Sequence, residues 1–238
     1  MALISLPAWS QDFTAQQIWG NAIFSFPESE KLYWELDVEP KLQISGNEQW
    51  QNIDVTPLLE YYPNHWIDLT AEMTSGYTDQ SDDINTVEIT PRLGIRLHFI
   101  KNVWQYLDTS ERVPLNRLSL ATLLRLEARN LWYNDNSSEH VLRLRFRFET
   151  KIAINRARLD YDRTIYCFTD VEYYIPIEKE VSERYASKFR LRIGPGYRLT
   201  FANRFELLFI YDFARNTLDE GVSKDAMAVN FRFKFYFN

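Results

Sequence analysis

The chain has 238 residues and a formal net charge of −6, which suits one domain with a sizeable core. Its 45% apolar and 25% charged residues exclude a disordered chain and a helical membrane protein, and no stretch reaches the ~18 consecutive apolar residues of a transmembrane helix. A single cysteine and three scattered histidines exclude a disulfide framework and disfavour a zinc site. We therefore expect neither a metal nor a cofactor.

The first ten residues look like the end of a secretory signal, because an apolar run beginning at Ala2 leads to the small residues Ala8 and Ser10. The basic start of such a signal is missing, so the alternatives are a truncated signal and an ordinary apolar lead-in. We predict that residues 1–10 are a signal remnant, that the protein is exported, and that residues 11–238 form a single domain.

Alternation of apolar and polar residues dominates the remainder of the chain and indicates β-strands with two different faces. Clear runs of this kind span 32–44, 53–61, 67–73, 87–99, 118–128, 142–154, 185–199 and 229–237. Weaker runs span 19–26, 165–175 and 205–213. Bacterial single-chain barrels have even strand numbers, so these eleven candidates predict 12 strands, with the missing one within 100–116. The alternative is 10 strands, with the first run outside the barrel.

Strand length favours a barrel that crosses a membrane. The runs reach about a dozen residues, whereas soluble strands have about five or six and membrane-crossing strands about 9–11. Charged residues such as Arg143 cannot face lipid, so we expect them in a lumen and the apolar face against acyl chains. A soluble lipocalin-like barrel has the opposite polarity, and periodicity alone does not separate the two. The predicted fold is an all-β, antiparallel, up-and-down transmembrane β-barrel.

Aromatic residues lie near the ends of many runs, where they are typical of the girdles at the two membrane interfaces. Ordinary aromatic packing is the alternative for each of them. The residues concerned are Trp19, Trp50, Tyr61, Tyr62, Trp66, Tyr77, Trp132, Tyr133, Tyr174 and Tyr197. Prolines at 40, 57 and 91 fall inside runs, where each removes a ladder hydrogen bond.

Charge is distributed unevenly along the chain. Residues 1–115 contain 6 basic and 17 acidic residues, a net charge of −11, whereas residues 116–238 contain 21 and 16, a net charge of +5. The predicted lumenal face is therefore acidic on early strands and basic on later ones. It is either a site for anions or small polar solutes or a network of ion pairs that fills a narrow barrel. The candidate lining residues are Arg143, Arg145, Arg147, Arg190, Arg192, Glu172, Glu35, Asp37 and Glu39.

Two patterns carry a resemblance to known proteins. The final run, with Phe231, Phe233, Phe235 and Phe237, resembles the signal read by the outer-membrane barrel assembly machinery, although Asn238 stands where the pattern places an aromatic. The segments 88–92, 143–149 and 189–198 resemble a family of small bacterial outer-membrane β-barrels that is catalogued as a domain of unknown function. The similarity spans most of residues 19–237, and it implies outer-membrane lipid and the assembly machinery as partners but no activity.

Catalysis is not expected, because no GxSxG elbow is present and nothing in the sequence brings His98 or His140 together with Ser119 or Glu139. Nucleic-acid binding is disfavoured by the negative net charge. The predicted function is an integral outer-membrane barrel, either a narrow channel or a binding barrel for small polar or anionic solutes. The alternatives are a soluble exported barrel that carries an apolar ligand and a barrel enzyme that acts on lipid.

Overall fold

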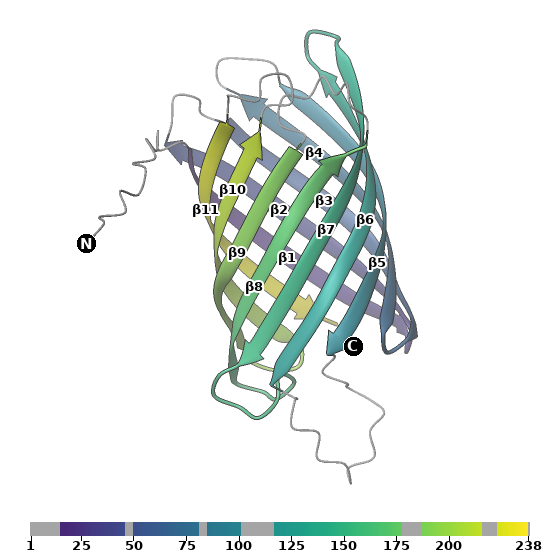
Figure 1. The fold of residues 1–238 in the computed structure, drawn as a ribbon, viewed down its shortest axis with the longest axis vertical. Helices are drawn as coiled ribbons and strands as arrows, with labels where there is room; N and C mark the ends of the chain where they lie inside the picture. Colours follow the sequence, from purple (N-terminus) through teal and green to yellow (C-terminus); the bar gives the residue numbers. More distant parts are fainter. Residues whose placement is uncertain are drawn as a thin grey trace, which may run out of the picture.

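A computed structural model describes residues 15–45, 50–80, 85–100, 117–177, 187–215 and 223–237. These residues form a closed β-barrel (Figure 1). No helix among them is long and apolar enough to cross a membrane. The strands are β1 (Gln16–Ser29), β2 (Leu32–Ser45), β3 (Trp50–Asn64), β4 (Ile67–Gln80), β5 (Thr86–Ile100), β6 (Leu118–Tyr133), β7 (Ser138–Ala153), β8 (Thr164–Pro176), β9 (Ser187–Arg198), β10 (Asn203–Arg215) and β11 (Ser223–Tyr236).

The strand count corrects the sequence-based expectation of 12, and the alternative of 10 is also wrong. All eleven alternating runs become strands, and each pairs with its neighbours in the chain in antiparallel fashion. The barrel closes because β1 and β11 pair in parallel, from Gln16 opposite Met227 to Ser25 opposite Tyr236. A parallel seam removes the need for an even number of strands. Residues 101–116, where the twelfth strand was expected, lie outside the described part of the chain.

An odd number of strands places the start of β1 and the end of β11 at opposite ends of the barrel (Figure 1). We call the end at which β1 begins the N-terminal end and the end at which β11 finishes the C-terminal end. Among the described residues, the connections β1–β2, β3–β4, β7–β8 and β9–β10 lie at the C-terminal end, because each odd-numbered strand runs toward it.

Prolines inside strands interrupt the ladder on one side only. The pairs between β1 and β2 pass from Trp19–Lys41 to Ala22–Val38 and skip Pro40, although Pro40 is paired with Ile53 on β3. Interruptions of the same kind occur at Pro57 and Pro91. Each proline lacks its backbone N–H, so it cannot donate a hydrogen bond to one neighbouring strand, but it remains paired with the strand on its other side.

The two faces of the barrel have the polarity that the sequence predicts. Charged side chains lie inside, where Glu127 and Glu172 are fully buried, and large apolar side chains lie on the outer surface of every strand. At the centre of β5, the side chain of Leu93 is 66% exposed. This polarity is the reverse of that of a soluble lipocalin-like barrel, which has its apolar face inside.

The aromatic residues divide between the two faces, which partly corrects the expected girdles. Exposed aromatics occur near both ends, with Trp66 at the C-terminal end and Trp132 at the N-terminal end. Trp19 and Tyr174, in contrast, are buried in the lumen. Their positions in the period-two alternation place them on the inward face, where their rings contact arginine side chains.

Candidate functional site: the charged lumen

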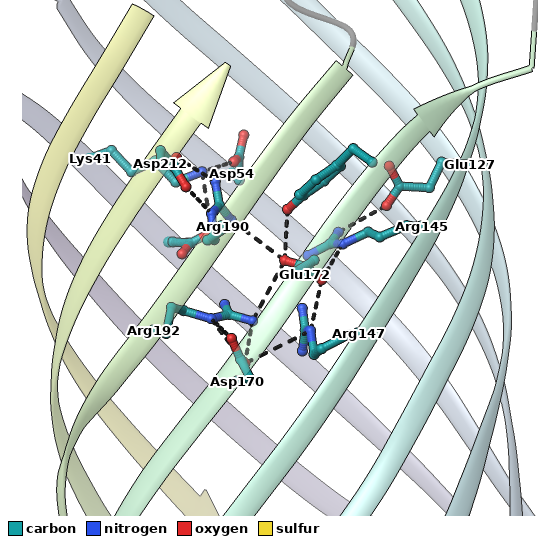
Figure 2. Close-up of polar contacts among 12 residues, drawn as sticks. Lys41, Asp54, Glu127, Arg145, Arg147, Asp170, Glu172, Arg190, Arg192 and Asp212 are labelled. Carbon is teal, nitrogen blue, oxygen red and sulfur yellow. Dashed lines mark hydrogen bonds and ion pairs between the residues drawn. The ribbon is translucent and has the colours of Figure 1, made fainter. Parts of the chain in front are cut away.

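The centre of the lumen is built around Glu172 of β8 (Figure 2). Its carboxylate accepts hydrogen bonds from the guanidinium groups of Arg145 and Arg147 on β7, the latter over 2.7 Å between Nε and Oε1. The Tyr174 hydroxyl donates a third bond to Oε2 over 2.8 Å. Glu172 lies directly opposite Arg147 on β7 and Arg190 on β9, so the register itself brings these charges together.

Three further carboxylates surround this centre and pair with the remaining arginines. Asp170 receives a two-pronged contact from Arg192, with an Nη2–Oδ2 distance of 2.7 Å (Figure 2). Asp212 of β10 receives a similar contact from Arg190. Glu127 of β6 is fully buried and is contacted by three arginines, Arg92, Arg143 and Arg145.

The five arginines that the sequence singles out therefore lie together and are neutralised. Charge-assisted, two-pronged contacts of this kind are the strong hydrogen bonds of protein interiors. Their cost is the desolvation of each ion, which is offset only when every partner is present. The arrangement matches the ion-pair network that was one of the two sequence-based readings. It does not assemble Arg143, Arg145, Arg147, Arg190 and Arg192 into a free anion site.

Aromatic rings help to hold this network in place. The Tyr174 ring lies 4.6 Å from the Arg143 guanidinium carbon and 4.8 Å from that of Arg145. The Trp19 ring of β1 lies 4.9 Å from the guanidinium carbon of Arg190. Trp19 also packs with Ile210 and Ala228 in a small apolar cluster on the inner wall. Cation–π contacts of this kind orient the guanidinium planes as well as stabilise them.

The acidic residues expected on early strands also lie on the lumenal side, and two of them have basic partners. Glu35 contacts Lys234 of β11 over 2.6 Å and Glu39 contacts Lys41 over 3.2 Å. Asp37 accepts a hydrogen bond of 2.7 Å from the Asn21 amide. The pair between Glu35 and Lys234 spans the strand between them, so it ties β2 to β11 across the parallel seam.

Between these groups the lumen contains a cavity of about 500 Å³. Within the described residues, its wall includes fourteen basic and nine acidic side chains. Glu127, Glu172, Asp170 and Asp212 do not belong to that wall, because they lie deeper than the arginines that cover them. The surface that faces the cavity is therefore richer in positive charge than the lumen as a whole.

The four candidate catalytic residues divide into two pairs, with His98 and Ser119 near one end of the barrel and His140 and Glu139 near the other. His98, near the C-terminal end of the barrel, contacts the carboxylate of Asp68 through Nε2. His140, near the N-terminal end, contacts the amide oxygen of Asn130 over 2.8 Å. Glu139 accepts a hydrogen bond from Tyr133 and lies beside His140, whereas Ser119 lies near the opposite end. Among the described residues, no group of three histidine, cysteine or acidic side chains is placed to hold a metal ion.

Some important lumenal residues are absent from the sequence-based list of candidate lining residues. Glu127, Asp170 and Asp212 complete the network, and Tyr166 reaches from β8 to Glu206 on β10, with an Oη–Oε1 distance of 2.6 Å. This reach requires Gly196 on the intervening strand, because a Cβ there would lie 2.3 Å from the Tyr166 ring. Alternation places each of these residues on the inward face, but it does not predict which of them meet.

These features define a class: an eleven-stranded, closed β-barrel with an apolar outer surface and a charge-paired lumen. Residues 16–221 match the family described as Protein of unknown function (DUF2490). Because the match covers most of the chain, the protein belongs to this family, as the resemblance in the sequence indicated. No curated protein and no solved structure matches the chain.

Proposed function

We propose that the protein is an integral β-barrel of the bacterial outer membrane whose lumen binds or slowly passes small polar or anionic solutes. The observation that carries the proposal is the polarity of the barrel. Large apolar side chains are exposed on the outside of all the strands, and the charged residues are inside. In water such a surface would be an aggregation hazard, whereas lipid acyl chains would cover it.

Strand length and the placement of aromatic residues support the same setting. The strands contain 12 to 16 residues, enough for the ~9–11 that a tilted strand needs to cross the hydrocarbon core. Exposed aromatics at both ends, such as Tyr77 and Trp66, are placed as membrane interfaces require. The alternative of a soluble carrier for an apolar ligand is disfavoured, because charged side chains line the cavity.

Assembly would use the last strand. Phe231, Phe233 and Phe237, three of the four aromatics in the run that resembles the assembly signal, are exposed on the outer face of the barrel. β11 also closes the barrel by pairing with both β10 and β1. The proposed partners are therefore outer-membrane lipid and the barrel assembly machinery, and no enzymatic activity is proposed.

Membrane fractionation tests the proposal directly. We expect the protein to sediment with outer membranes, to require detergent for extraction, and to migrate differently on gels with and without boiling. The apolar outer surface is the reason for the first two results, and a stable closed barrel is the reason for the third. Recovery as a monodisperse monomer from plain buffer would contradict the membrane setting.

The paired lumen also predicts a small conductance. Large side chains occupy the lumen and most of their charges are neutralised, so we expect planar bilayers with the unmodified protein to show at most small currents. Replacing Arg145 and Arg190 together by alanine removes bulk and leaves carboxylates with fewer partners. We expect conductance to rise and selectivity to move toward cations.

The control for this experiment is Arg156→Ala, because Arg156 is exposed in the β7–β8 connection and does not line the cavity. It should leave the currents unchanged. A large and steady conductance from the unmodified protein would show that the lumen is open and that charge pairing does not close it.

A further inference from the structure

One arginine on the cavity wall differs from all the other basic side chains there. Arg204, the second residue of β10, has no carboxylate partner among the described residues. Each of the remaining thirteen lysines and arginines of the wall forms an ion pair with an aspartate or a glutamate. The Nε atom of Arg204, like those of Arg92, Arg125 and Arg232, is buried without a hydrogen-bond partner.

The neighbours of Arg204 in the sheet are also basic. Arg198 on β9 lies directly opposite it on one side, and Lys234 on β11 lies directly opposite it on the other. Like charges that face each other across a ladder are destabilising. Three strands therefore present a row of three cationic side chains at one level near the C-terminal end. Lys234 already pairs with Glu35 and Arg198 donates to the Leu159 carbonyl, so an anion bound in this row would offset mainly the charge of Arg204.

Contacts around Arg204 fix its position and occupy the nearest carboxylate. The Tyr236 ring lies 4.7 Å from the Arg204 guanidinium carbon and 4.9 Å from Lys234 Nζ, so one ring holds both cations. Glu206, the next inward residue of β10, accepts hydrogen bonds from Tyr166 and from Arg232, one at each carboxylate oxygen. Glu206 is thus already engaged, and Arg204 stays directed at the cavity.

We propose that Arg204, supported by Lys234, binds a small water-borne oxyanion with a phosphate or carboxylate group at the C-terminal end of the lumen. The planar guanidinium matches two oxygens of such a group, and a cavity of about 500 Å³ has room for a small ion or metabolite. The inference deepens the proposed function by naming the ligand class. It rests on the part of that proposal that gives the lumen a binding role, and not on the membrane setting.

Calorimetric titration of the purified, folded barrel with inorganic phosphate at low salt tests the site. We expect saturable binding that weakens as salt is added. Arg204→Gln should weaken it roughly tenfold to a hundredfold, since hydrogen bonds to charged groups contribute about 1.5–3 kcal/mol. The matched control is Arg156→Gln, at an exposed position in a connection at the same end of the barrel, which should bind as the unmodified protein does.

A second measurement needs no variant. Phenylglyoxal modifies accessible arginines, and mass spectrometry locates the adducts. Arg204 should react, and phosphate should protect it. Failure of phosphate to bind, undiminished binding by Arg204→Gln, or absence of protection would overturn the proposal. A soluble short-chain phospholipid is titrated in parallel, and binding of the phospholipid alone would also overturn it.

The two proposals fail in distinguishable ways. Recovery of the protein from the soluble fraction would refute the membrane setting but leave phosphate binding intact. A membrane protein that ignores phosphate would refute only the anion site.

Discussion

Glu172→Gln is expected to lower the free energy of unfolding by about 3–5 kcal/mol, the cost of removing one partner from a buried ion pair. The change preserves the size of the side chain but removes the negative charge that Arg145 and Arg147 share. Arg192 is a third cation beside this carboxylate, with its Nη2 atom 3.7 Å from Glu172 Oε2. Without the negative charge, three guanidinium groups would repel one another in a buried site. Denaturant titration of the folded barrel, followed by the gel shift on boiling, measures the loss.

The matched control is Glu28→Gln, which makes the same chemical change at an exposed position of β1. Surface substitutions of this kind change stability by about 0.5 kcal/mol or less. Adding Arg147→Met to Glu172→Gln removes one of the surplus cations and should recover part of the stability. Equal stability of the Glu172→Gln and Glu28→Gln variants would show that the central network contributes little to the fold.

Leu93→Arg is expected to destabilise the barrel in a lipid bilayer by about 2–4 kcal/mol, the cost of a cation at the membrane midplane. Leu93 is the middle residue of β5, and its side chain is the most exposed of the large apolar residues described. An arginine at position 93 would point outward, away from the lumenal network in which the neighbouring Arg92 pairs with Glu127. Unfolding in lipid vesicles measures the effect.

The comparison variant is Leu199→Arg, which makes the same change at an exposed residue just beyond the end of β9. A cation near the membrane interface costs only about 0–1 kcal/mol, so the two variants should differ by most of the midplane cost. If both substitutions leave stability unchanged, the outer surface does not face lipid. In that case the soluble alternative is favoured, because an arginine exposed to water has no such cost.

The strands and their two faces were predictable from the sequence because both depend on local pattern. A period of two assigns each residue to one face, and residues as different as Arg145 and Leu144 alternate without ambiguity. The opposite net charges of the two halves of the chain likewise predicted acidic and basic strands. The same local reasoning placed Trp19 in a girdle because it lies near the start of a run, although its parity in the alternation places it in the lumen.

The closure of the barrel and the choice of partners inside it were decided only by the tertiary structure. Closure depends on how β1 meets β11, two strands about two hundred residues apart, and no local pattern distinguishes a parallel seam from a missing twelfth strand. Pairing across the lumen depends on register and on reach over intervening strands, as between Tyr166 and Glu206. In the sequence, Arg204 and the neutralised Arg190 are alike, since each is an inward arginine on a late strand. They differ because Asp212 lies within reach of Arg190, whereas the residues directly opposite Arg204 are both basic.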